Sequence, residues 1–158
     1  MFQINADEHV LGYLGRALSL ELSAVQLYST QSMLVASWGL ADVADKFREE
    51  SREEMGHAER IISRMLALGV APNASQLRPV KIGRNLQDLL EHDYAFEKEL
   101  VGLYEKATSH CARSGDQDGR LFFEALLNEE KVHAADLTKW IQKVKSTETQ
   151  TSTKNITY

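Results

Sequence analysis

Several features are missing from this chain, and each absence excludes a class of protein. It has one cysteine, Cys111, among 158 residues, which excludes an intrachain disulfide framework and a cysteine-rich zinc or iron–sulfur site. No apolar run approaches the ~18 residues that span a membrane. Asp7 and Glu8 stand where a secretory signal would be apolar. We therefore expect a protein of the reduced cytoplasm.

Basic residues are also in deficit. The chain has 18 Lys and Arg against 23 Asp and Glu, for a formal net charge of −5. This balance provides no basic face for nucleic acid and mildly favours cations as ligands. The length and the 43% of hydrophobic residues are ordinary for one globular domain with a substantial core.

Proline is rare, and the apolar residues recur every three or four positions, which is the helical period. The spacing predicts four long helices, over residues 6–36, 39–68, 83–112 and 116–145. Gly69 is suited to a left-handed helix end, and Asp116 to capping the fourth helix. Both prolines, Pro72 and Pro79, fall in the longest connection.

The connections predict how these helices are arranged. A short turn makes the first two antiparallel neighbours, whereas residues 70–82 form a long crossover. The fold class is therefore all-α: one four-helix bundle over residues 1–145 with one long crossover connection. Residues 146–158, STETQTSTKNITY, contain almost nothing apolar. We expect them to form a short, weakly ordered polar tail.

The stretch EEMGHAER contains a Glu-x-x-His pair, Glu54 and His57, whose side chains project from one side of a helix. Alone, such a pair is more often part of a solvated face than a metal site. A second pair, Glu130 and His133, follows the first at a constant offset of 76 (130 − 54 and 133 − 57). The same offset superimposes the first predicted helix on the third, so the chain consists of two related helical hairpins.

Two further glutamates interrupt apolar stripes. Glu21 lies among Leu14, Leu18, Val25 and Tyr28, and Glu97 lies at the equivalent place between Tyr94 and Val101. A carboxylate on a core-facing stripe is costly unless it is paired or bound to a cation. One Glu from each of two helices, with one Glu-x-x-His from each of the other two, is the ligand pattern of di-iron carboxylate bundles.

The six residues predict a dinuclear site for Fe²⁺ or Mn²⁺, because their ligand atoms are carboxylate oxygens and imidazole nitrogens. Glu54 and Glu130 are the natural bridging ligands. Glu21 and Glu97 would be terminal, with one histidine on each metal. The alternative is a buried ion-pair network in which Arg16, Arg52 or Lys131 neutralises the acids. Tyr28 and Tyr104, seven residues after Glu21 and Glu97, are candidates for bonding a ligand or donating an electron; the alternative is an ordinary core role.

With these motifs, the chain resembles the bacterioferritins of the ferritin-like superfamily. The likeness covers residues 9–145 and is carried by LELSAVQLY, SWGL, EEMGHAERIISRMLALGVAPN and NEEKVH. It implies a ferroxidase that oxidises Fe²⁺ with O₂ or H₂O₂ at a centre of two iron ions per subunit. It also implies that dimers assemble into a shell of twenty-four subunits that stores ferric mineral. The implied ligands are Glu21, Glu54, His57, Glu97, Glu130 and His133.

The resemblance implies haem as well. Met55 matches the position at which bacterioferritins ligate haem b, one methionine from each of two subunits; the alternative is an apolar dimer contact. Positions that often hold an accessory iron site are Glu49 and Glu53 here, with Glu50 nearby as a third candidate. The tail is a poor match to the family's short fifth helix, of which it would be a degenerate version.

Other interpretations of the same residues remain open. A peroxide-scavenging di-iron protein of the rubrerythrin type would store little iron. A haem-bearing structural subunit would need a more active second chain in a mixed shell. In the ferroxidase interpretation, a ferredoxin-type protein is the expected partner that supplies electrons for iron release. We expect His9, His92 and His110 to be surface or helix-end residues and Cys111 to be a small buried residue.

Overall fold

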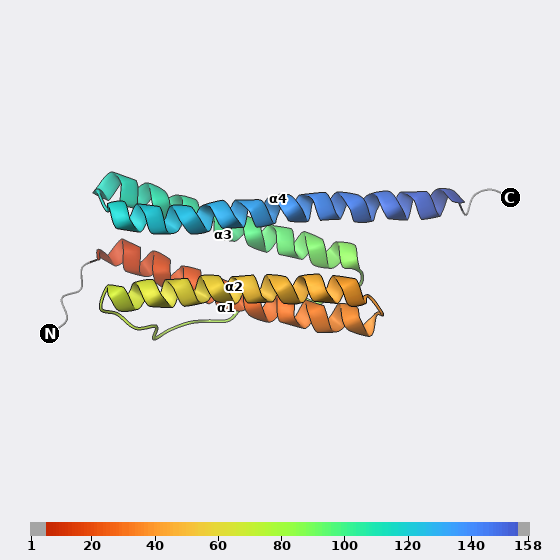
Figure 1. The fold of residues 1–158 in the computed structure, drawn as a ribbon, viewed down its shortest axis with the longest axis horizontal. Helices are drawn as coiled ribbons and strands as arrows, with labels where there is room; N and C mark the ends of the chain where they lie inside the picture. Colours follow the sequence, from red (N-terminus) through yellow and green to blue (C-terminus); the bar gives the residue numbers. More distant parts are fainter. Residues whose placement is uncertain (1–5, 155–158) are drawn as a thin grey trace.

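The computed structural model describes residues 6–154, with side chains described to residue 149. It contains four helices, α1 (Glu8–Ser37), α2 (Ala41–Ala67), α3 (Leu86–Ser114) and α4 (Gln117–Lys154). Helices α1 and α2 form one antiparallel hairpin and α3 and α4 form another, and the two hairpins lie side by side (Figure 1). The predicted all-α four-helix bundle is thus confirmed.

Side-chain caps and glycines set the helix ends. Asp7 and Asn85 accept hydrogen bonds from the backbone N–H groups of Val10 (2.7 Å) and Asp88 (2.9 Å), as is usual at helix N-termini. Gly69 follows α2 with φ of 83°, a left-handed conformation that glycine adopts without strain. Asp116 accepts from the N–H of Gly119 at 2.9 Å. The predicted roles of Gly69 and Asp116 are therefore confirmed.

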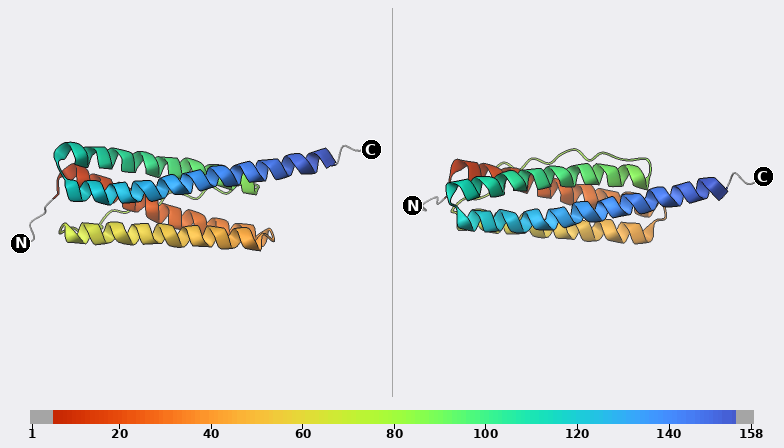
Figure 2. Two further views of the ribbon diagram at one scale, coloured as in Figure 1. Left: turned by 45° about the horizontal axis from the view of Figure 1, so that its top comes forward. Right: turned by 90° about the horizontal axis from the view of Figure 1, so that it is seen from above.

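The long crossover between α2 and α3 runs along α1 and α3 (Figure 2). Ser19 and Ser23 of α1 accept hydrogen bonds from the backbone N–H groups of Gln76 (3.1 Å) and Arg78 (3.0 Å). The Arg78 side chain also forms an ion pair with Glu99 of α3. These contacts hold an otherwise irregular segment along the bundle.

The core consists of two apolar clusters. One contains Leu14, Leu18, Tyr104 and Phe123, and the other contains Tyr28, Phe47, Leu89 and Leu90. Phe47 and Phe123, which the repeat relates, are exposed to only 0% and 1%. Tyr94 differs from the prediction, because its side chain is 36% exposed at the edge of α3 near Lys98 and Lys131. The buried stripe on α3 thus consists of Leu90, Glu97, Val101 and Tyr104 without it.

Helix α4 is longer than predicted and extends beyond the rest of the bundle in Figure 1. Residues 146–154, predicted to be a weakly ordered tail, continue this helix, and no separate fifth helix occurs up to Lys154. The hydroxyls of Thr147 and Thr149 bond to the carbonyls of Lys143 and Lys145 one turn earlier, each at 3.0 Å. A helix satisfies its own backbone bonds, so this polar segment is helical without a packed apolar face. Residues 155–158 of the predicted tail lie outside the described residues.

The helices of this bundle are amphipathic, as their alternating apolar and charged residues predict. Across residues 6–154, none combines the length and apolar character needed to cross a membrane. Their apolar faces instead meet one another in the centre of the bundle. This packing places the six predicted metal ligands between the two apolar clusters.

Candidate dinuclear metal centre

The six predicted ligands meet in the interior of the bundle, with Glu21 on α1, Glu97 on α3, and one Glu-x-x-His pair on each of α2 and α4. All four glutamates have 0% exposure. The side chains of His57 and His133 are 7% and 12% exposed. The six residues form two overlapping groups that each bring their ligand atoms within 4.8 Å of one another: Glu21, Glu54, His57 and Glu130 in one, and Glu54, Glu97, Glu130 and His133 in the other.

The arrangement of the carboxylates divides this cluster into two halves. His57 Nδ1 lies 2.7 Å from Glu130 Oε1 and 3.2 Å from Glu54 Oε2. His133 Nδ1 lies 3.4 Å from Glu130 Oε2 and 3.0 Å from Glu54 Oε1. Each of these two carboxylates therefore presents one oxygen to each histidine. Glu21 belongs only to the half that contains His57, and Glu97 only to the half that contains His133.

The two tyrosines join the hairpins through this cluster. Tyr28 on α1 donates a 2.6 Å hydrogen bond to Glu97 Oε1 on α3, and Tyr104 on α3 donates one of 2.6 Å to Glu21 Oε1 on α1. Both tyrosines are buried, and burial followed by nearby carboxylates raises the pKa of each phenol well above its usual value. Each hydroxyl thus stays protonated and fixes one carboxylate.

The acids have too few protein donors. Glu21 Oε2 and Glu97 Oε2 are buried without a hydrogen-bond partner, and the buried Glu54 Oε1 and both oxygens of Glu130 face only histidine nitrogens. Arg16, Arg52 and Lys131, the expected cations of the alternative network, do not reach them. Arg16 lies over the Tyr13 ring and Arg52 pairs with exposed Glu49, while Lys131 is exposed. No Lys or Arg pairs with the four acids in the described part of the chain. The alternative prediction of a buried ion-pair network is therefore wrong.

The pKa values of these residues reflect the close approach of several buried carboxylates. Burial, followed by the Glu21 carboxylate, raises the pKa of Glu54 to about 8, and burial followed by Glu130 raises the pKa of Glu97 well above its usual value. Burial lowers the pKa of His133, but Glu130 and Glu54 outweigh it and raise that pKa to about 12. Because desolvated carboxylates lack counter-charges, protons take the place of cations here.

The far side of each histidine ring faces an acid of the other hairpin. His133 Nε2 lies 2.7 Å from Glu53 Oε2, and His57 Nε2 lies 3.7 Å from Glu129 Oε2. Glu53 and Glu129 are separated by the same offset as the ligands (129 − 53 = 76). The sequence predicts Glu53 only as an accessory metal ligand and does not single out Glu129, although the repeat offset relates the two residues.

The accessory candidates are only partly brought together. Glu50 and Glu53 join His133 in a third group of ligand atoms within 4.8 Å. Glu49 is not in this group; its side chain is 61% exposed and pairs with Arg52 at 3.4 Å. A surface cavity lined by Glu53, His57, Glu129 and His133 opens between α2 and α4. Both ring Nε2 edges are therefore reachable from the surface.

Two buried polar residues near the cluster, Asp93 and Gln31, are also not predicted from the sequence. Asp93 on α3 has 0% exposure, and its Oδ1 accepts a 2.6 Å hydrogen bond from Gln31 on α1. Burial raises the pKa of Asp93 well above its usual value, and nearby Glu97 adds to this effect. Asp93 has an alanine, Ala17, at the equivalent position of the repeat, so the offset contained no signal for it.

Met55, the predicted haem ligand, lies on the outside of α2. Its side chain is 40% exposed, whereas its neighbour Glu54 is fully buried. One residue along a helix corresponds to a rotation of about 100°, which accounts for the difference. The thioether is thus accessible from outside the bundle.

Comparison with known proteins is consistent with this architecture. Residues 11–147 match the family model of the ferritin-like domain. A bacterioferritin of Rhodobacter capsulatus is 42% identical over 130 residues, which cover 82% of this chain and 81% of that protein. A bacterioferritin of Brucella melitensis is 35% identical over the same shares of both proteins.

Solved structures give the same result. The R. capsulatus bacterioferritin, determined with a metal-free dinuclear site and a haem iron in a crystallographic special position, matches with a TM-score of 0.85 and 40% identity over 89% of this chain and 88% of that one. Bacterioferritin BfrA of Mycobacterium tuberculosis matches with a TM-score of 0.86 and 28% identity over 92% and 91%. The chain belongs to the bacterioferritin family of iron-storage proteins.

Proposed function

We propose that this protein is a ferroxidase that oxidises Fe²⁺ at the buried cluster and stores the ferric product. The observation that carries the proposal is the sharing of Glu54 and Glu130 between the two histidines. Two carboxylates that each present one oxygen to either half of a site are suited to bridging two cations. Two divalent ions would balance the four carboxylates and satisfy their unpartnered oxygens.

In this proposal each residue has a defined role. Glu54 and Glu130 would hold both iron ions, because each presents one oxygen to either half of the cluster. Glu21 and His57 complete one site, and Glu97 and His133 complete the other. Tyr28 and Tyr104 hold the terminal carboxylates in place through their hydrogen bonds. Tyr28 is also a candidate electron donor, because its ring is buried beside the cluster.

The chemistry requires two electrons, and the two ions supply them. Each Fe²⁺ loses one electron to become Fe³⁺. The pair then reduces one H₂O₂ with two protons to two water molecules, or one O₂ with two protons to H₂O₂. Hard oxygen ligands favour the ferric product. Glu50 and Glu53, which lie with His133 at the cavity, are proposed to bind iron that passes between the cluster and the surface.

Haem b is the second proposed cofactor, held by Met55 and the same residue of a second subunit. A thioether is a ligand that haem iron accepts, and the Met55 side chain is accessible on the outer side of α2. Haem would supply a redox centre for electrons from a reductant of the ferredoxin type, which would release stored iron. This role is separate from the buried cluster.

Storage requires an assembly, and we propose dimers that build a shell of twenty-four subunits, alone or mixed with a second subunit type. The support is family membership together with the lengths of chain matched in both bacterioferritin structures. Helix α4 continues to Lys154, so we propose that this segment takes part in subunit contacts at the end of the bundle.

The test is a titration of metal-free protein with Fe²⁺ in air, followed by ferric absorbance. We expect a fast phase that ends near about two iron ions per chain, then slower uptake of many more into soluble protein. Glu21→Ala should abolish the fast phase while the helical circular dichroism remains. Glu49→Ala, which removes an exposed acid outside the cluster, is the matched control.

Other results would redirect the proposal. Normal fast oxidation in Glu21→Ala would refute the assignment of the centre. Saturation at about two ions per chain without further soluble uptake would refute storage and favour a peroxide-scavenging protein.

A further inference from the structure

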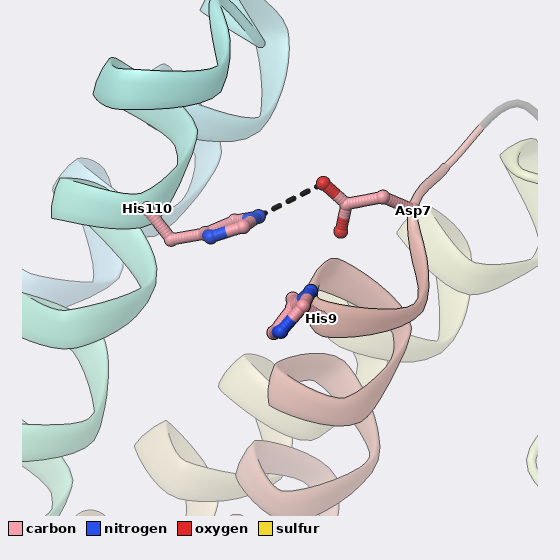
Figure 3. Close-up of side chains that lie close together, drawn as sticks. All are labelled: Asp7, His9 and His110. Carbon is pink, nitrogen blue, oxygen red and sulfur yellow. Dashed lines mark hydrogen bonds and ion pairs between the residues drawn. The ribbon is translucent and has the colours of Figure 1, made fainter.

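A second group of metal-binding side chains lies at one end of the bundle, apart from the dinuclear centre. Asp7 and His9 stand at the beginning of α1, and His110 stands near the end of α3 (Figure 3). One ligand atom from each of the three lies within 4.8 Å of the others. No residue of the dinuclear centre is part of this group.

The Asp7 carboxylate uses its two oxygens separately. Oδ1 accepts a 2.7 Å hydrogen bond from the N–H of Val10 and caps α1. Oδ2 points across to α3, 2.8 Å from His110 Nε2, as Figure 3 shows. The cap thus fixes the carboxylate and leaves the second oxygen facing the other hairpin.

The two imidazoles complete the group. The His9 and His110 rings stack with centroids 4.9 Å apart and an interplanar angle of 30°. The side chain of His110 is 18% exposed and that of Asp7 is 44% exposed, so the group lies at the surface and water can reach it. Ligands of one transition-metal ion lie about 3 Å apart, since metal–nitrogen bonds are about 2.0–2.1 Å. The His9 side chain is exposed, so it can rotate toward the other two ligand atoms.

We propose that Asp7, His9 and His110 bind one divalent transition-metal ion, as a mononuclear site independent of the dinuclear centre. Two imidazole nitrogens and one carboxylate oxygen suit Zn²⁺, Fe²⁺ and Co²⁺, with water in the remaining positions. A hydrogen bond between Asp7 and His110 alone accounts for neither the stacked His9 nor the convergence of three ligand atoms. The bound ion links the two hairpins, because His110 comes from the second and the other two ligands from the first.

The test is a calorimetric titration of the metal-free protein with Zn²⁺ near neutral pH. We expect about three Zn²⁺ per chain for the natural sequence, two at the dinuclear centre and one here. Asp7→Asn is the sharpest variant, because asparagine still caps a helix but removes the charged ligand. Asp7→Asn, His9→Gln and His110→Gln should each lose the third equivalent or bind it at least tenfold more weakly.

His92→Gln is the matched control, since His92 lies on α3 outside the group. It should keep all three equivalents. Zn²⁺ should also raise the melting temperature of the natural protein more than that of Asp7→Asn, because the ion joins the hairpins. Titrations of the three ligand variants that match the natural protein would overturn the proposal, as would an equal loss in His92→Gln. The first two equivalents and Fe²⁺ oxidation report separately on the dinuclear centre.

Discussion

Glu53 and Glu129, which face the outer Nε2 atoms of His133 and His57, offer a sharp test of how the centre is built. A metal-bound histidine is oriented by the partner of its other ring nitrogen, and loss of that partner commonly costs 10- to 100-fold in metal affinity. Glu53 Oε2 lies 2.7 Å from His133 Nε2, within hydrogen-bond distance. Glu129 Oε2 lies 3.7 Å from His57 Nε2 and is paired with Arg60 at 2.5 Å.

These distances predict unequal effects from two equivalent substitutions. Glu53→Gln should lower the affinity of the site beside His133 for its metal ion by about tenfold, which corresponds to about 1.4 kcal/mol of binding free energy. The lower end of the 10- to 100-fold range applies because the Glu53 side chain is 44% exposed. Water can therefore replace part of the lost hydrogen bond to His133. Glu129→Gln should weaken binding beside His57 by less than about threefold, because there is little hydrogen bond to lose.

The assay is an anaerobic titration of the metal-free proteins with Co²⁺, followed by visible absorbance and fitted with separate affinities. The two variants are matched in chemistry and in position within the repeat, so each serves as control for the other. An equal or larger loss in Glu129→Gln would refute the reasoning from distance. Unchanged affinity at the centre in Glu53→Gln, with fewer ions bound in total, would mean that Glu53 acts only as an accessory ligand and does not orient His133.

Three further predictions concern haem, protons and stability. Met55→Leu should remove haem absorbance from protein expressed with excess haem without changing the fast phase of Fe²⁺ oxidation. Near neutral pH, metal binding should release protons into weakly buffered solution, because Glu54 (pKa about 8) and His133 (pKa about 12) are protonated without metal and must ionise or become neutral to bind it. Asp93→Asn should stabilise the metal-free protein, and increasingly so as the pH rises above the usual Asp value of 3.8. The folded state keeps a proton there that the unfolded chain loses, and urea unfolding at acidic and neutral pH measures the difference.

Much of this architecture could be predicted from the residues alone. Helical periodicity located four helices, and the constant offset between Glu54–His57 and Glu130–His133 identified a repeated metal-binding motif. The end of α4 could not be predicted in this way. Residues 146–154 lack the apolar period from which helices are recognised, yet they continue a helix already begun. Propagation of a helix costs far less than its nucleation, so a polar segment can follow where it would not start.

The sequence by itself indicated most of the side chains that face the interior, since the faces of a helix follow from its period of 3.6 residues, although Tyr94 is exposed and Asp93 is buried against that expectation. The repeat related the interior positions of one hairpin to those of the other. It did not determine which atoms meet, because contacts between helices depend on how each is rotated and how far it is shifted along its neighbour. Only the tertiary structure showed that Glu54 and Glu130 each face both histidines. It alone placed Asp7 beside His110, 103 residues away, because packing of the two hairpins aligns the beginning of α1 with the end of α3.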